Sequence, residues 1–191
     1  YRPTPLQFKY EGKTYFNERP ISTQQTADTY IAQLRSYLPD AIGGILWYGS
    51  DDPNMISYTP IYCHNTIVPE CFNAPDADGG NFSWKSAFWV CNWVSNMTYP
   101  RYNQVFPAVQ RVRNELDSTW IAQQPSVEAK AQELYKTSPD KAQEFLNSYS
   151  LQCAATMLKD WKKLGEYIIV KYNDMTVKPE KDGKFERTAD G

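Results

Sequence analysis

The sequence predicts an α+β fold, with short strands in its first third and helices afterwards. Two runs near the start alternate in polarity around a glycine-containing break, which is typical of an antiparallel strand pair. A later run, GGILWYGS, has the apolar composition of a strand buried on both faces. From residue 83 onward, apolar residues recur every three or four positions, the period of a helix with one buried face.

The chain divides at one segment of loop composition. VPECFNAPDADGGN is rich in Pro, Asp, Gly and Asn, which favour turns. We expect four parts: strands, a helix and a β-hairpin in 1–67, a loop in 68–82, a helical region in 83–174 and a polar tail in 175–191. The tail is charged and contains Gly and Pro, so it should pack lightly on the surface.

Two hairpins are expected in the first part. The runs LQFKY and KTYFNE flank Glu11 and Gly12, which suit a tight turn. The second hairpin joins GGILWYGS to MISYTPIYC through DDPN, a turn by its Asp, Pro and Asn. Pro60 lacks an amide hydrogen for the ladder, so the strand that carries it should lie at a sheet edge or contain a bulge.

A capping box predicts a helix between the two hairpins. The Ser22 hydroxyl can accept a hydrogen bond from an amide of the first turn, and Gln25 can reach back to the amide of the cap. The apolar positions of this helix would be Ala27, Ile31 and Leu34. Pro39 ends the pattern, so the helix should run from Ser22 to about Leu38.

Serine and proline positions divide the helical region. Ser83 can cap a first helix, and Pro125 should separate a second helix from a third. Ser138 and Pro139 should start another short helix, and a long last helix follows it. In that last helix Gly165 is a weak point that costs about 1 kcal/mol relative to alanine.

The composition argues against several classes of function. The chain has 20 Lys and Arg against 22 Asp and Glu, so it lacks the positive surplus that nucleic-acid binding requires. No apolar stretch approaches the roughly 20 residues of a membrane-spanning helix. With one histidine and no C-x-x-C pair, the sequence predicts no metal site, and we expect no cofactor.

The cysteines leave the redox compartment open. They are Cys63, Cys71, Cys91 and Cys153. Cys63 and Cys71 are close enough in sequence for a local disulfide, yet free cysteines are the commoner state in proteins that are not secreted. His64 is the single histidine, which weakens any proposal of a Ser/His/Asp or Cys/His catalytic site.

The run NERPISTQQTA, from Asn17 to Ala27, carries the best candidate site. Pro20 disfavours helical geometry at the residue before it, so Arg19 should sit in extended chain at the positive end of the expected helix. A guanidinium and free helix amides together suit a carboxylate or a developing oxyanion. The alternative is an ordinary surface arginine or a structural ion pair before a common capping box. Arg35 is expected to be a structural ion-pair residue.

The tryptophans raise a second functional hypothesis. Exposed indoles stack on sugars and cations, so the chain would then be a non-catalytic helical module for ligand binding or assembly. Core packing explains four of the six tryptophans instead, because they fall on the apolar faces of expected helices: Trp89, Trp93, Trp120 and Trp161. Trp84 and Tyr48 lie nearer to loops and are candidates for pocket walls.

Taken in order, the motifs of this chain resemble the bacterial dipeptidase A family of cysteine dipeptidases. They are NERPISTQQTA, AQLRSYLPDAIGGILWYG, TPIYC with VPE, FSWKSAFWV and GEYIIVKYND. Their order and spacing together are specific, and the resemblance extends nearly to Asp174. Members of this family are N-terminal-nucleophile hydrolases, distant relatives of bile salt hydrolase and penicillin V acylase.

The resemblance implies a four-layer αββα sandwich and hydrolysis of short peptides through an acyl-enzyme. In this family a processed N-terminal cysteine supplies the nucleophile through its thiolate and the base through its own α-amine, so no histidine is needed. No cysteine of this chain is N-terminal. We therefore expect the C-terminal part of such an enzyme, which is inactive alone and has the N-terminal half of the same polypeptide as its partner.

The resemblance also implies roles for individual residues. In the acylase relatives an arginine lies just before a helix that is followed by a β-hairpin, and Arg19 has that place here. Arg19 would organise the active site or bind a substrate carboxylate, with Ser22, Gln24 and Gln25 as weaker substrate-binding candidates. Self-association is expected through an apolar face of the GGILWYG strand. The resemblance also implies a bacterial protein, and its compartment stays open, either cytoplasmic or exported.

Overall fold

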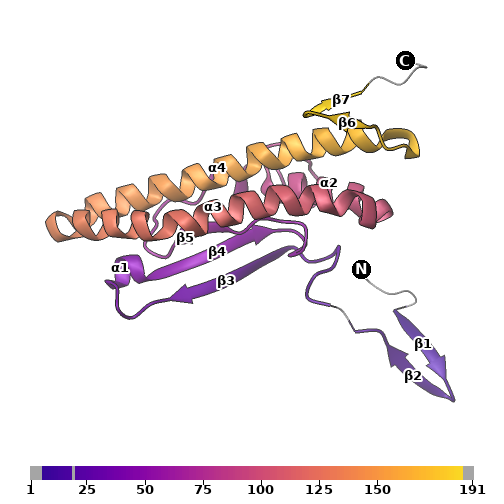
Figure 1. The fold of residues 1–191 in the computed structure, drawn as a ribbon. Coiled ribbons are helices and arrows are strands. Elements are labelled where there is room, and N and C mark those ends of the chain that lie inside the picture. Colours follow the sequence, from indigo (N-terminus) through magenta and orange to yellow (C-terminus); the bar gives the residue numbers. More distant parts are fainter. Residues whose placement is uncertain (1–5, 19, 187–191) are drawn as a thin grey trace.

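The computed structural model describes residues 6–18 and 20–186. Two long helices, α3 (Tyr102–Thr137) and α4 (Pro139–Tyr172), cover one face of a three-stranded antiparallel sheet (Figure 1). The sheet has the order β3-β4-β5. Its strands span Asp28–Leu34, Gly44–Ser50 and Thr59–Tyr62. The mixture of helix and sheet that the sequence predicts is therefore confirmed.

Both expected hairpins are present. β1 (Gln7–Tyr10) and β2 (Lys13–Phe16) pair across Glu11 and Gly12, whose positive φ angles of 47° and 75° make the turn. This first hairpin extends away from the sheet and the helices (Figure 1). β4 and β5 form the second hairpin, and Pro60 lies on β5 at an edge of the sheet, as its missing amide hydrogen predicts.

The expected helix from Ser22 to Leu38 is wrong. Its central part is the strand β3, which pairs with β4 along its full length of seven residues. The segment DTYIAQL contains the strand-forming residues Thr, Tyr and Ile, and the ladder satisfies backbone groups that the helix would have bonded internally. The Ser22 hydroxyl donates to the Asp52 carboxylate and does not cap a helix.

The helical region differs from expectation at three boundaries. α2 (Ala87–Thr98) begins later than predicted, because Ser86 and not Ser83 caps it. α3 continues through Pro125, an exposed position where water can bind the carbonyl that loses its amide partner. α4 is one helix where two were expected, but its predicted start at Ser138 is confirmed.

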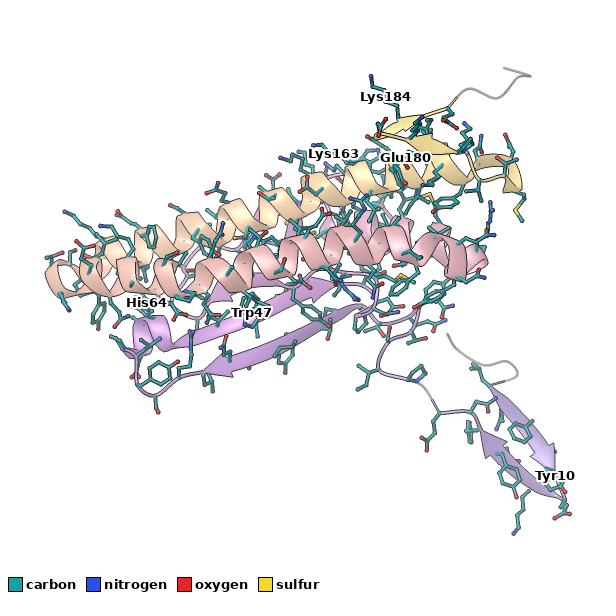
Figure 2. The ribbon with its side chains drawn as sticks, viewed as in Figure 1. Tyr10, Trp47, His64, Lys163, Glu180 and Lys184 are labelled. Atoms are coloured by element: carbon teal, nitrogen blue, oxygen red, sulfur yellow. The ribbon has the colours of Figure 1, made fainter. Side chains whose placement is uncertain are left out.

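Short elements complete the chain. They are α1 (Asp40–Gly43), the 3-10 turns η1 (Glu70–Phe72), η2 (Tyr99–Arg101) and η3 (Asn173–Met175), and the strands β6 (Glu180–Lys181) and β7 (Lys184–Phe185). β6 and β7 form a hairpin beside α4, where Lys171 Nζ lies 2.9 Å from Glu180 Oε2. The expected lightly packed tail thus contains a small hairpin that is anchored to α4 (Figure 2).

The core lies between the sheet and the helices. Ile45 and Tyr62 are each 1% exposed, and Trp47 lies between the sheet and α3 (Figure 2). Trp120 of α3 and Trp161 of α4 are 3% and 0% exposed, so the prediction that they fill the core is confirmed.

Gly165 has a packing role in α4. It faces Trp93 of α2, and a Cβ atom at this position would overlap the indole ring. The missing side chain therefore lets the two helices approach closely. This contact offsets the cost of about 1 kcal/mol that a glycine imposes inside a helix.

Two negative observations concern residues 6–18 and 20–186. None of the helices in this part has both the length and the apolar character needed to span a bilayer. The same residues include no group of three or more His, Cys, Asp or Glu side chains arranged to bind a metal ion.

Candidate functional site

Two adjacent carboxylates, Asp51 and Asp52, are buried directly after β4. Both residues are 0% exposed, and no described lysine or arginine forms an ion pair with either of them. Burying a charge without a partner is costly, so such groups need hydrogen bonds. Here the donors are neutral groups from separate segments of the chain.

Asp51 connects the sheet to α2. Its backbone is left-handed, with a φ of 82°, and its amide donates to the Ala27 carbonyl at 2.8 Å. Asn92 and Ser95 of α2 donate to its carboxylate at 2.8 and 2.5 Å. Burial raises the pKa of Asp51, although the hydrogen bonds from Ser95 and Asn92 act in the opposite direction.

Asp52 connects the segment before β3 to the end of α2. Its carboxylate accepts hydrogen bonds from the Ser22 hydroxyl, from the Tyr99 hydroxyl and, at 3.1 Å, from the Asn54 amide. Burial, and then the hydrogen bond to Asp52, raise the pKa of Tyr99. The phenol therefore stays protonated and remains a donor.

An open cleft of about 740 Å³ lies on the other side of the Asp52 donors Ser22, Asn54 and Tyr99. Its lining residues are Pro20, Ser22, Pro53, Asn54, Tyr99 and Tyr102. The Asn54 side chain donates to Tyr102 Oη at 2.6 Å, and Arg113 donates to the Asn54 carbonyl at 3.0 Å. Hydroxyl and amide groups of this kind suit a small polar ligand.

Of the four site residues predicted from the sequence, one is found at this cleft. Ser22 lines the cleft, whereas Gln24 and Gln25 contact their neighbour Thr23 at 3.4 and 3.0 Å and do not line it. Arg19 lies outside the described residues. The roles proposed for these four residues stay predictions.

The acidic pair was not predicted from the sequence, because the DDPN motif was interpreted only as a turn. Asn54, Tyr99 and Tyr102 were not predicted either. One signal was available, since residues 36–84 contain no lysine or arginine. Two consecutive aspartates in such a stretch, directly after a buried strand, have no basic neighbour in sequence. Only the fold shows that Asn92 and Ser95 of α2 donate to Asp51, and that Ser22, Asn54 and Tyr99 donate to Asp52.

Arg35 is a structural residue, as predicted. Its guanidinium forms a buried ion pair with Glu128 of α3. It also donates to the carbonyls of Gly43 and Ile42, each at 3.2 Å. These contacts fix the turn before β4 against α3.

The four cysteines are free thiols, so Cys63 and Cys71 are not joined by a disulfide. Cys71, Cys91 and Cys153 are buried, and burial raises the pKa of all three, to about 12 for Cys71 and about 11 for Cys153. Thiols of this kind carry little thiolate at neutral pH and make poor nucleophiles. Cys63 is exposed and lies beside Gly44 at the start of β4.

Comparison with known proteins identifies the family. Residues 3–115 match peptidase family C69. The chain belongs to this peptidase family. The match covers the whole sheet, α2 and every residue that lines the cleft, and the resemblance predicted from the motifs is confirmed.

The curated relatives of this C69 chain are bacterial. A probable dipeptidase B of Streptococcus pyogenes serotype M1 is 25% identical over 145 residues, which are 76% of this chain and 28% of the relative. A probable dipeptidase of Latilactobacillus sakei is 26% identical over 116 residues, 59% of this chain and 23% of that protein. The chain thus spans less than a third of the length of these relatives.

Proposed function

We propose that this chain is the C-terminal part of a cysteine dipeptidase that hydrolyses short peptides through an acyl-enzyme. The nucleophile would be the N-terminal cysteine of a longer parent protein, within an αββα sandwich completed by the N-terminal half. The observation that carries the proposal is the family match, because it includes the cleft and the acidic pair behind it.

The state of the cysteines supports a nucleophile from outside this segment. Cys71, Cys91 and Cys153 are buried thiols with raised pKa values. Cys63 is the one exposed thiol, but it lies far from the acidic pair. Its amide donates to the Gly44 carbonyl at the start of β4, whereas Asp51 and Asp52 follow the end of that strand. Seven residues of strand separate the two places, roughly 20 Å at about 3.3 Å per residue.

The cleft would bind the two charged ends of a dipeptide. The substrate's ammonium group would lie toward Asp52, and the hydroxyl groups of Tyr99 and Tyr102 would bind its peptide group. Arg19 directly precedes Pro20, which lines the cleft, so its guanidinium is proposed to bind the substrate carboxylate or to organise the nucleophile. Ser22, with Gln24 and Gln25 beside it, would complete the substrate-binding segment.

An aromatic surface favours a second candidate function, ligand binding through tryptophans. Phe82 and Trp84 are 48% and 50% exposed, and their rings meet edge to face with centroids 4.8 Å apart. Such a platform suits stacking on a sugar or a cation. Trp84→Ala should leave dipeptide hydrolysis by the parent unchanged if the platform serves a separate function.

The test of the proposed function compares the 191-residue chain with the longer parent protein. Both are incubated with a panel of unprotected dipeptides, and the release of free amino acids is measured. We expect turnover by the parent, none by the chain alone, and loss of turnover when the parent's N-terminal cysteine is replaced by serine. Hydrolysis by the purified chain, or none by the parent, would refute the proposal.

A further inference from the structure

The hydroxyl groups of Ser22 and Tyr99 have a fixed direction. Both donate to the Asp52 carboxylate, Ser22 to Oδ1 and Tyr99 to Oδ2. A carboxylate ion can only accept hydrogen bonds, so each hydroxyl must direct its proton toward Asp52. Burial and the contact with Asp52 raise the pKa of Tyr99, so the phenol keeps this proton at neutral pH.

The two hydroxyl oxygens therefore remain to the cleft only as acceptors. Ser22 and Tyr99 both line the cleft, and no described residue donates a hydrogen bond to either oxygen. A hydroxyl group has one proton and two lone pairs, and Asp52 already takes the proton. Each oxygen can offer a ligand only a lone pair, so this part of the wall binds hydrogen-bond donors.

Tyr102 lines the same cleft with the opposite polarity. Its hydroxyl oxygen accepts from the Asn54 side-chain amide at 2.6 Å. The Tyr102 proton has no acceptor among the described residues, so this hydroxyl can donate to a ligand. The rings of Tyr99 and Tyr102 are neighbours, with centroids 6.2 Å apart. The cleft therefore places one donor beside two acceptors.

A free amino group next to a carbonyl group matches this pattern. The nitrogen of an amino group has two or three hydrogens and can donate to both Ser22 and Tyr99, whereas a peptide amide has only one hydrogen. The carbonyl oxygen beside the amino group can accept from Tyr102. These two groups occur together at the first residue of a peptide with an unblocked N-terminus.

We propose that Asp52 is a positioning residue, which holds the protons of Ser22 and Tyr99 and thereby makes the cleft specific for the free amino group of a peptide. The ligand is the dipeptide of the proposed function, on which this assignment rests. The binding of that substrate becomes more specific, because Tyr99 accepts from the amino group and Tyr102 alone donates to the carbonyl. Asp52 itself does not touch the substrate.

The first test measures binding without catalysis. Alaninamide and propionamide differ only in the amino group, and each is titrated into the 191-residue chain while the NMR signals of the protein are followed. Alaninamide should bind at least about tenfold more tightly, because a hydrogen bond from a charged donor is worth at least that factor. The Asp52→Asn chain should lose most of this preference. Equal affinities, or no binding of alaninamide, would overturn the proposal.

The second test uses the longer parent protein and two substrates. Propionyl-alanine lacks only the amino group of alanyl-alanine, so the ratio of the two kcat/KM values measures selection of that group. Asp52→Asn replaces one carboxylate oxygen by a nitrogen that can only donate, so one of the two hydroxyls must turn its proton toward the cleft. The ratio should fall about tenfold or more from its wild-type value.

Two further variants separate the direction of the hydroxyls from the charge. Asp51→Asn removes the neighbouring negative charge but leaves Ser22 and Tyr99 bonded to Asp52, so the wild-type ratio should be kept. Tyr99→Phe keeps the Asp52 charge and removes one acceptor, so the ratio should fall as in Asp52→Asn. A thermal melt checks each fold, and Tyr99→Phe decides the question if Asp52→Asn does not fold.

The outcomes distinguish this role of Asp52 from the proposed function. A parent that hydrolyses neither substrate refutes the function, and the titration with the two amides then tests Asp52 by itself. A parent that hydrolyses both substrates equally well is a peptidase without selection of the amino group, which overturns the proposal. Equal falls in the ratio for Asp51→Asn and Asp52→Asn, or an unchanged ratio in Tyr99→Phe, would show that hydroxyl direction does not select the substrate.

Discussion

The two ends of β4 bury charge in opposite ways. Before the strand, the Arg35 guanidinium is paired with Glu128 and donates to two backbone carbonyls. After the strand, Asp51 and Asp52 are buried without a cationic partner among the described residues, and hydroxyl and amide groups alone donate to them.

This difference separates a structural site from a candidate functional one. The side chains of Arg35 and Glu128 are 7% and 11% exposed, and they hydrogen-bond with Ile42 and Tyr62 of a hydrophobic cluster. Ser22, Asn54 and Tyr99, the donors of Asp52, instead line an open cleft. The start of β4 therefore holds the fold, and the end of β4 lies next to the candidate site.

The largest expected effect on stability is at the start of β4, where Arg35 and Glu128 form the buried ion pair. Glu128→Ala leaves the Arg35 guanidinium buried without a carboxylate, so the free energy of unfolding should fall by about 3 to 5 kcal/mol. The double variant Arg35→Met/Glu128→Leu removes both charges and should recover most of this loss. Urea denaturation of the three proteins measures the effect. A loss below about 1 kcal/mol for Glu128→Ala would show that the pair does not hold the fold.

At the end of β4, removal of the Asp51 charge and removal of its hydrogen bonds should change the free energy of unfolding by different amounts. Asp51→Ala leaves the half-buried Asn92 amide without its acceptor and Ser95 with only the Cys91 carbonyl, and it places alanine at a positive φ of 82°, so the free energy of unfolding should fall by about 2 to 3 kcal/mol. Asp51→Asn keeps the shape and tolerates a positive φ. Ser95 can then donate to the Cys91 carbonyl, 3.0 Å away, and accept from the new amide.

The free energy of unfolding of Asp51→Asn should therefore lie within about 1 kcal/mol of the wild-type value in the same urea titration. Equal losses in Asp51→Ala and Asp51→Asn would show that the negative charge itself holds α2 in place. The contrast between the two ends of β4 would then disappear.

The third prediction concerns catalysis by the longer parent protein. Arg19→Lys keeps the charge but loses the planar two-donor fork, so kcat/KM should fall roughly ten- to hundredfold, the equivalent of about 1.5 to 3 kcal/mol. The loss should appear mainly in KM if Arg19 binds the substrate carboxylate, and in kcat if it organises the nucleophile. Steady-state kinetics on a dipeptide, beside a thermal melt, distinguish the two.

Arg111→Lys provides the matched control, because Arg111 lies on the exposed surface of α3 with Glu115 as its partner. Its activity should equal that of the wild-type parent. Activity of Arg19→Lys within twofold of the parent, at unchanged stability, would make Arg19 an ordinary surface or structural arginine.

The smallest expected effect is on the pH dependence of stability. The folded chain holds the Asp51 proton to higher pH than the unfolded chain does, because burial raises the pKa above 3.8. As pH rises from 3.8 through the raised pKa, this residue therefore lowers the free energy of unfolding. In the Asp51→Asn variant, the free energy of unfolding should not show this decrease with rising pH.

The measurement is the difference in free energy of unfolding between the wild-type chain and Asp51→Asn across this range. The difference cancels the contribution of Asp117, whose pKa burial also raises. A difference that does not change with pH would mean that the carboxyl titrates alike in the folded and unfolded chains.

Local signals in the sequence predicted several turns and element positions of this molecule. The turn at Glu11 and Gly12, the edge position of Pro60 and the start of α4 at Ser138 depend on a few adjacent residues. Each follows from the chemistry of the backbone at that point: a positive φ, a missing amide hydrogen or a side-chain cap. The order of the motifs likewise determined the peptidase family.

Tertiary contacts decided the rest. Residues 28–34 form a strand because β4 supplies a partner for each of them, although their apolar spacing also fits a helix. Asp51 and Asp52 became a buried pair because Ser95 and Tyr99, more than 40 residues later, supply donors. Hydrogen bonds and burial between distant segments outweigh local preferences of a few tenths of a kcal/mol per residue, and such partners are known only once the chain is folded.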